Sequence, residues 1–278
     1  MILEPVSTAS LWLGLATATA YIAPALAAGR LGSAAIRGML FAAWVLHALS
    51  LISGIMAHRF GFAPALSMTA WLVLTVYGVE SRFYPQMRAR WALAVLGGLA
   101  VLLTLLAPGS PTRMDESPWL PLHWALGIAS YGLFAAAVVH AWLLRRAERQ
   151  MRKAAQPPDG VPLLTLERLT FRFVQAGFVM LTATLLAGWL FGESLGSTWN
   201  YWKWEHKTVF SVLAWLTFAA LLIGRKRFGW RGRVAVRVLY LGALLLLMAY
   251  VGSRFVLEVV LGRTPVSYTH LRAHETGR

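Results

Sequence analysis

The chain has 278 residues, of which 58% are hydrophobic and only 13% are charged, and its mean hydropathy is +0.60. Because soluble domains carry about 25% charged residues, this composition excludes an ordinary water-soluble protein. The net charge of +15 would suggest nucleic acid as the partner of a soluble protein. Basic residues also collect in the cytoplasmic loops of membrane proteins, so we expect no nucleic-acid partner.

Eight apolar segments follow one another along the chain. They cover residues 8–28, 34–57, 63–80, 91–107, 121–144, 171–192, 206–223 and 235–257. Each is long enough to cross a hydrocarbon core of about 30 Å as a helix that rises ~1.5 Å per residue. The predicted fold is therefore all-α, a polytopic membrane helix bundle with about eight transmembrane helices in the lipid bilayer.

The basic residues alternate between the two sides that these segments define. Eighteen Lys and Arg residues lie in or beside the connections after the first, third, fifth and seventh segments, whereas six lie on the other side and two near residue 278. Basic residues resist translocation, so the richer side is predicted to be cytoplasmic. Both termini are then expected on the outer, periplasmic side.

The first segment has one feature of a signal peptide, since Ala25-Leu26-Ala27 is typical of a cleavage site. No Lys or Arg precedes Arg30, and the apolar stretch exceeds the roughly 7–15 residues of a signal-peptide core. We therefore interpret it as a retained helix. The polar stretch 145–172 contains a Pro-Pro-Asp-Gly turn sequence and is interpreted as a solvated connector, followed by a candidate interfacial helix over 163–169.

Residues 265–278 have no apolar periodicity and no relation to a membrane helix. The string SYTHLRAHET within them resembles a translated sequencing adapter. We therefore treat residues 1–264 as one transmembrane domain and exclude the tail, with His270 and His274, from functional reasoning.

Five histidines remain, at positions 47, 58, 123, 140 and 206. His47 lies near the middle of its segment, and an ionisable group at that depth faces the bundle interior or a polar cavity. It is therefore either functional or a neutral histidine satisfied by a neighbouring helix. His140 lies near the cytoplasmic interface and is interpreted as structural. The other three fall at the outer ends of segments.

The outer stretch before the seventh segment concentrates aromatic and charged residues. It reads Trp199-Asn200-Tyr201-Trp202-Lys203-Trp204-Glu205-His206-Lys207. An aromatic belt at the membrane interface explains single Trp and Tyr residues. The mixture would also suit a flat, apolar, anionic ligand, because rings stack on aromatics, carboxylates pair with Lys and iron accepts a His nitrogen. Haem has these properties, so a belt and a haem site both remain open.

This stretch, with Trp215 further along, resembles the tryptophan-rich signature of the cytochrome c assembly membrane proteins of the CcsA/CcmC type. Glu205 and His206 stand where that family has Asp and Pro. His123, followed by Ser130-Tyr131, is similar to the family's external haem-ligand histidine and the Ser-Tyr after it. Stretches 229–233 and 249–254 resemble the small HemX-like branch, which includes YpjD-like inner membrane proteins.

The resemblance implies a haem-handling protein of the bacterial inner membrane that supports c-type cytochrome assembly with assembly partners and performs no turnover of its own. It implies His123 as the first axial ligand to the haem iron and His206 as the second. The other implied haem-contacting residues are Trp199, Trp202 and Trp204 as a stacking floor, Lys203 or Lys207 for the propionates, and His47 on a transmembrane haem path. Larger family members carry a second external His after the Trp-rich stretch, which residues 207–264 lack. Either His206 substitutes for it, or haem binds weakly, or only the scaffold is retained.

Other functions are weighed against haem handling. A HemX-like regulator or scaffold of tetrapyrrole metabolism, without stoichiometric haem, could use the basic loops to contact a soluble enzyme. A small-molecule transporter is disfavoured, because only Glu80 and Glu193 approach segment ends. No Walker-type or HExxH pattern occurs. Because the sequence has no Cys, it cannot exchange thiols with an apocytochrome, and a separate partner would keep those thiols reduced.

Overall fold

The computed structural model describes residues 8–27, 30–83, 90–111, 119–153, 162–190 and 206–249. Within these ranges the chain forms eight helices: α1 (Thr8–Leu26), α2 (Ser33–Met56), α3 (Phe62–Phe83), α4 (Arg90–Leu106), α5 (Trp119–Lys153), α6 (Leu163–Leu190), α7 (His206–Phe228) and α8 (Gly232–Leu247). Within the described residues, six of these helices, all except α4 and α8, are long and apolar enough to cross a membrane. The chain is therefore a multi-pass helical membrane protein, as its composition predicted.

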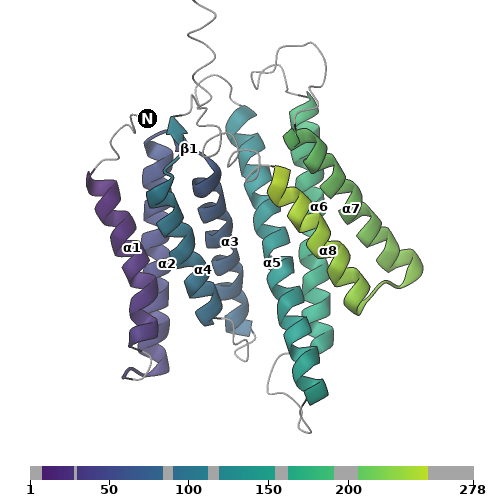
Figure 1. The fold of residues 1–278 in the computed structure, drawn as a ribbon, viewed down its shortest axis with the longest axis horizontal. Coiled ribbons are helices and arrows are strands. Elements are labelled where there is room, and N and C mark those ends of the chain that lie inside the picture. Colours follow the sequence, from purple (N-terminus) through teal and green to yellow (C-terminus); the bar gives the residue numbers. More distant parts are fainter. Residues whose placement is uncertain are drawn as a thin grey trace, which may run out of the picture.

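Successive helices run in alternate directions along the bundle (Figure 1). Helices α1 to α4 pack together, α5 to α8 pack together, and the contact of α3 with α5 joins the two groups. One end carries a two-stranded antiparallel pair, β1 (Arg59–Phe60) and β2 (Ser110–Pro111), and α5 and α7 begin at this same end (Figure 1). We call this the strand end. The opposite end, where α5 ends and α8 begins, is the arginine end.

The α5–α8 group packs around two stacked phenylalanines. The rings of Phe134 in α5 and Phe218 in α7 have centroids 3.7 Å apart within a fully buried cluster. Glycines in the neighbouring helices admit these rings, because a Cβ at Gly177 would lie 3.1 Å from Phe134 and one at Gly242 would lie 2.7 Å from Phe218. Lipid is as apolar as the side chains, so helix association in a membrane depends on such close packing.

Helices α5 and α6 extend furthest beyond the apolar segments that were predicted. Helix α5 continues past residue 144 to Lys153, and α6 begins at Leu163 rather than 171. The candidate interfacial helix is therefore the first two turns of α6, and residues 145–153 are helix rather than connector. Loss of hydropathy marks where a chain leaves the membrane, whereas the helix continues because Arg and Glu are good helix formers. The turn at 157–160 and everything after residue 249, including the tail, lie outside the described residues.

The turn between α7 and α8 is tight. Gly229 and Gly232 have φ values of +66° and +56°, a left-handed conformation that favours glycine. The Trp230 ring between them folds back over Gly224, where a Cβ would lie only 2.3 Å from the ring. This turn places the first residues of α8 at the arginine end.

Candidate functional site

His123 occupies the second turn of α5 at the strand end and is half-buried. The backbone of α6 passes beside it, since a Cβ at Gly188 would lie 3.4 Å from its Cε1. Its buried Nδ1 has no hydrogen-bond partner in the part of the chain that the structure describes. A neutral imidazole nitrogen without a protein partner can act as a lone-pair donor to a metal.

Lys207 lies in the first turn of α7 and is close enough to His123 to interact with it electrostatically. The two residues come from different helices and are both next to α6. A cation beside an unpaired imidazole nitrogen can pair with the carboxylates of a ligand whose metal binds that nitrogen. The structure thus brings together His123 and Lys207, two residues that the sequence assigned to one site.

The tryptophan-rich part of the predicted haem site and the His206 side chain are not placed. Trp199, Trp202, Lys203 and Trp204 lie outside the described residues. His206 is the first residue of α7, and its side chain is likewise outside the described part. The stacking floor and the second axial ligand therefore remain predictions.

At the strand end, strand β1 packs against the start of α5, the helix that carries His123. Phe60 in β1 stacks on Trp124, the next residue of α5, with ring centroids 4.3 Å apart and planes 13° from parallel. Gly109, with φ +80°, precedes β2 and approaches Phe60 so closely that a Cβ would lie 2.7 Å from its backbone. These contacts link the start of α5 to the connections before α3 and after α4.

His47 lies apart from this site, within the α1–α4 group, and is fully buried. Its Nδ1 is 3.0 Å from the Tyr21 hydroxyl of α1, and its Nε2 is 2.8 Å from the Ser67 hydroxyl of α3. Both ring nitrogens therefore have partners, as expected of a neutral histidine satisfied by neighbouring helices. A haem iron could bind His47 only after one of these hydrogen bonds broke.

His140 has a partner that the sequence did not reveal. Its Nδ1 is 2.8 Å from the carbonyl oxygen of Ala136 and donates to it, and its Nε2 is 2.7 Å from Oε2 of Glu80 in α3. The two side chains are only 2% and 10% exposed. Since Nδ1 is the donor to Ala136, a contact this short needs one proton between Nε2 and Oε2. The available sequence signal was that Glu80 lies near the end of an apolar segment. No nearby residue in the sequence identifies His140 as its partner.

Two residues of the expected family signatures form hydrogen bonds to neighbouring helices. The Tyr131 hydroxyl donates to the carbonyl oxygen of Leu246, which ties α5 to α8 at 2.7 Å. Nε1 of Trp215 donates to the Thr182 hydroxyl, which ties α7 to α6 at 2.9 Å. The helices that carry His123 and Lys207 are thereby fixed to their neighbours.

Comparison with known proteins agrees with the signatures. A family model described as cytochrome C assembly protein matches residues 33–261. The inner membrane protein YpjD of Escherichia coli strain K12 is 30% identical over 197 residues, which cover 70% of this chain and 73% of YpjD. An uncharacterised 28.8 kDa protein of Azospirillum brasilense is 31% identical over 189 residues, 63% of this chain and 68% of that protein.

The chain is also similar to a cytochrome c biogenesis protein CcsA. The CcsA of Synechococcus sp. strain CC9902 is 34% identical over 162 residues, which cover 49% of this chain and 52% of CcsA. No solved structure matches the chain. Because the family model covers residues 33–261 of 278, the resemblance seen in the sequence is confirmed, and the chain belongs to the cytochrome c assembly protein family.

Proposed function

We propose that this protein binds haem at the strand end of the bundle and supports c-type cytochrome assembly in a bacterial inner membrane. The observation that carries this proposal is the buried Nδ1 of His123, which has no hydrogen-bond partner among the described residues and lies within electrostatic range of the Lys207 cation. A buried polar atom without a hydrogen-bond partner is rare in a folded protein, and binding of a ligand would give this nitrogen a partner. Haem supplies an iron that accepts a histidine nitrogen and propionates that pair with Lys.

The rest of the site follows from the sequence. His206, at the start of α7 beside Lys207, is proposed as the second axial ligand. Trp199, Trp202 and Trp204 would stack on the porphyrin, and Lys203 would share the propionates with Lys207. The protein would present haem as cargo on the outer face to its assembly partners rather than turn it over. The CcsA relative is a cytochrome c biogenesis protein by name, which supports this role.

An optical spectrum of the full chain, purified in detergent and then titrated with hemin, tests the proposal. We expect a Soret band that saturates at one haem per chain and an affinity about tenfold or more lower in His123→Ala. His206→Ala should change the spectrum of the complex, because one axial ligand is replaced.

Two control variants separate this site from other histidines. His47→Leu should leave the Soret band unchanged, because both nitrogens of His47 already have partners within the fold. Replacing His270 and His274 together by Ala should also leave it unchanged. Saturable binding that survives His123→Ala, or is lost only in a control, would contradict the assignment of His123.

A second candidate is a regulatory or scaffold role without stoichiometric haem. It is favoured by the helical extension of α5 to Lys153, which offers a basic helix beyond the apolar segment to a soluble partner. The YpjD relative, which matches most of this chain, is named only as an inner membrane protein. Absence of saturable haem binding in the intact protein, together with a soluble enzyme whose co-purification depends on residues 145–172, would favour this role.

A further inference from the structure

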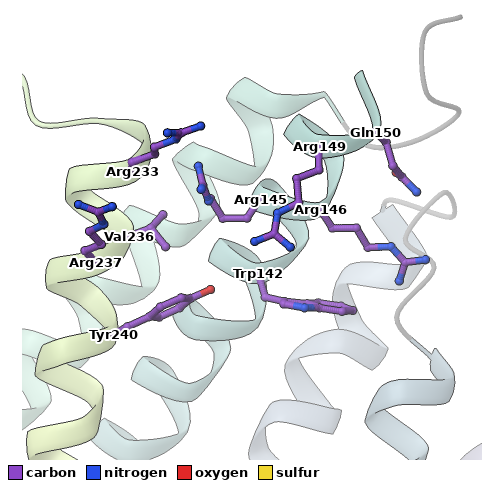
Figure 2. Close-up of a pocket in the computed structure, with 9 residues that line it drawn as sticks. All are labelled: Trp142, Arg145, Arg146, Arg149, Gln150, Arg233, Val236, Arg237 and Tyr240. Carbon is purple, nitrogen blue, oxygen red and sulfur yellow. The ribbon is translucent and has the colours of Figure 1, made fainter. Parts of the chain in front are cut away.

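A cleft of about 790 Å³ opens at the arginine end between the last turns of α5 and the first turns of α8 (Figure 2). Five arginines line it: Arg145, Arg146, Arg149, Arg233 and Arg237. None of the lining residues is acidic. The volume lies within the range of about 300–1,000 Å³ that is common for small-ligand sites.

Most of these arginines lack a carboxylate partner. Arg145 pairs with Glu148 at 2.8 Å, and the guanidinium of Arg146 lies over the Trp142 ring, 5.6 Å from its centroid. For Arg149, Arg233 and Arg237 the described part of the chain offers no carboxylate within ion-pair distance. Like charges that share a cleft repel one another, so a bound anion would stabilise this arrangement.

Two nearby arginines outside the cleft, Arg225 and Arg231, do have a carboxylate within ion-pair distance. At the same end of the bundle, Oε1 of Glu167 in α6 forms an ion pair with Nη1 of Arg225 at 2.7 Å. The same oxygen lies 3.7 Å from Nε of Arg231. An acidic residue is thus placed against arginines where α6 and α7 meet. The α5–α8 cleft contains no equivalent acid among its lining residues.

The cleft lies where both helices change from apolar to charged. Arg145 to Arg149 directly follow the apolar part of α5, and Arg233 and Arg237 precede that of α8. Trp142 and Tyr240 line its apolar side and are 40% and 38% exposed. Trp and Tyr are enriched where the hydrocarbon core meets the lipid headgroups.

The orientation of the side chains suits a ligand that is charged at one end only. Figure 2 shows Arg145 and Arg149 extending from α5 into the space beside α8, with the Tyr240 hydroxyl directed into the same space. Tyr240 lies close enough to both of these arginines to interact with them electrostatically. After Tyr240 in the sequence, the exposed side chains of Leu241 and Leu244 add apolar surface to α8.

We propose that this cleft binds the phosphate of an anionic phospholipid, whose acyl chains lie along the apolar surface of α8. Planar guanidinium groups bind phosphate oxygens in pairs. Basic clefts between transmembrane helices on the cytoplasmic side are suited to such headgroups. A free anion from the cytoplasm could use the arginines but would gain nothing from Trp142, Tyr240 and the leucines. This lipid site lies at the opposite end of the bundle from the proposed haem site, and its test does not depend on whether haem binds.

Lipid binding to the purified full chain tests this proposal. Native mass spectrometry in detergent would measure the dissociation constants of phosphatidylglycerol and phosphatidylcholine, and inorganic phosphate would be added as a competitor. The cleft variant replaces Arg149, Arg233 and Arg237 by Gln. The matched control replaces Arg168, Arg172 and Arg227 by Gln, which removes three exposed charges from the same end of the bundle outside the cleft.

We expect one phosphatidylglycerol to bind at least tenfold more weakly to the cleft variant than to the unaltered chain, and the control variant to bind it normally. Equal loss in both variants would show attraction by net charge alone and would overturn the proposal. Equal binding of phosphatidylcholine, or displacement of the lipid by millimolar phosphate, would overturn it as well.

The three replaced residues are exposed and unpaired in the described structure, so the cleft variant should fold. A second variant with Lys at Arg149, Arg233 and Arg237 keeps the charge but loses paired donation to one phosphate. We expect this variant to bind phosphatidylglycerol more weakly than the unaltered chain. Unchanged binding would refute recognition by guanidinium groups.

Discussion

Replacing Glu80 by Ala should lower the free energy of unfolding by about 3 kcal/mol, because it leaves a buried imidazole nitrogen without a partner. Nε2 of His140 lies 2.7 Å from Oε2 of Glu80, and neither atom has a further hydrogen-bond partner among the described residues. An unpaired buried polar group costs about 1–3 kcal/mol. The lost contacts of the Glu80 methylenes add about 1 kcal/mol.

Glu80→Gln separates the hydrogen bond from the charge. The Gln amide can donate to Nε2 of His140 while Nδ1 still donates to Ala136, so we expect a loss below about 1 kcal/mol. Glu148→Ala is the matched control, because Glu148 pairs with Arg145 where both side chains are more than 20% exposed, at 22% and 23%. Such a pair contributes less than about 1 kcal/mol.

Reversible unfolding of the purified protein in mixed detergent micelles, titrated with sodium dodecyl sulfate, would measure these differences. Replacing both Glu80 and His140 by Leu should recover much of the loss, since apolar residues can replace a buried pair. A Glu80→Ala loss no larger than that of Glu148→Ala would refute the reasoning. A Glu80→Gln loss as large as that of Glu80→Ala would show that the carboxylate charge is needed.

Two further stability predictions use the same titration. Gly224→Ala should destabilise the fold by about 1–3 kcal/mol, because its Cβ would lie 2.3 Å from the Trp230 ring, whereas Gly78→Ala, with nothing within 4 Å, should be neutral or stabilising. Equal effects of the two glycine variants would contradict the close packing of this turn. Tyr131→Phe should cost about 1 kcal/mol, because it removes the hydrogen bond to the carbonyl of Leu246, and an unchanged unfolding midpoint would show that this bond contributes nothing.

The candidate site could be predicted in part from the sequence. His123 and Lys207 were assigned to one side of the membrane from the charge pattern, and the structure brings them together because α5 and α7 both begin at the strand end and lie next to α6. The packing roles of Tyr131 and Trp215 were not predicted. Their signature positions suggested the ligand-binding family, but hydrogen bonds to Leu246 and Thr182 depend on which helices are neighbours.

The order of the helices, their approximate limits and the family could be predicted from the sequence, because they depend on local hydropathy and on short motifs. It could not determine which helix faces meet. In a membrane bundle, apolar side chains face both the lipid and the neighbouring helices, so hydropathy does not mark the buried face. The Glu80–His140 pair, the two partners of His47 and the cleft between Arg149 and Arg233 each join residues far apart in the chain. These contacts could not be predicted from the sequence, because they form only when specific faces of the helices pack together.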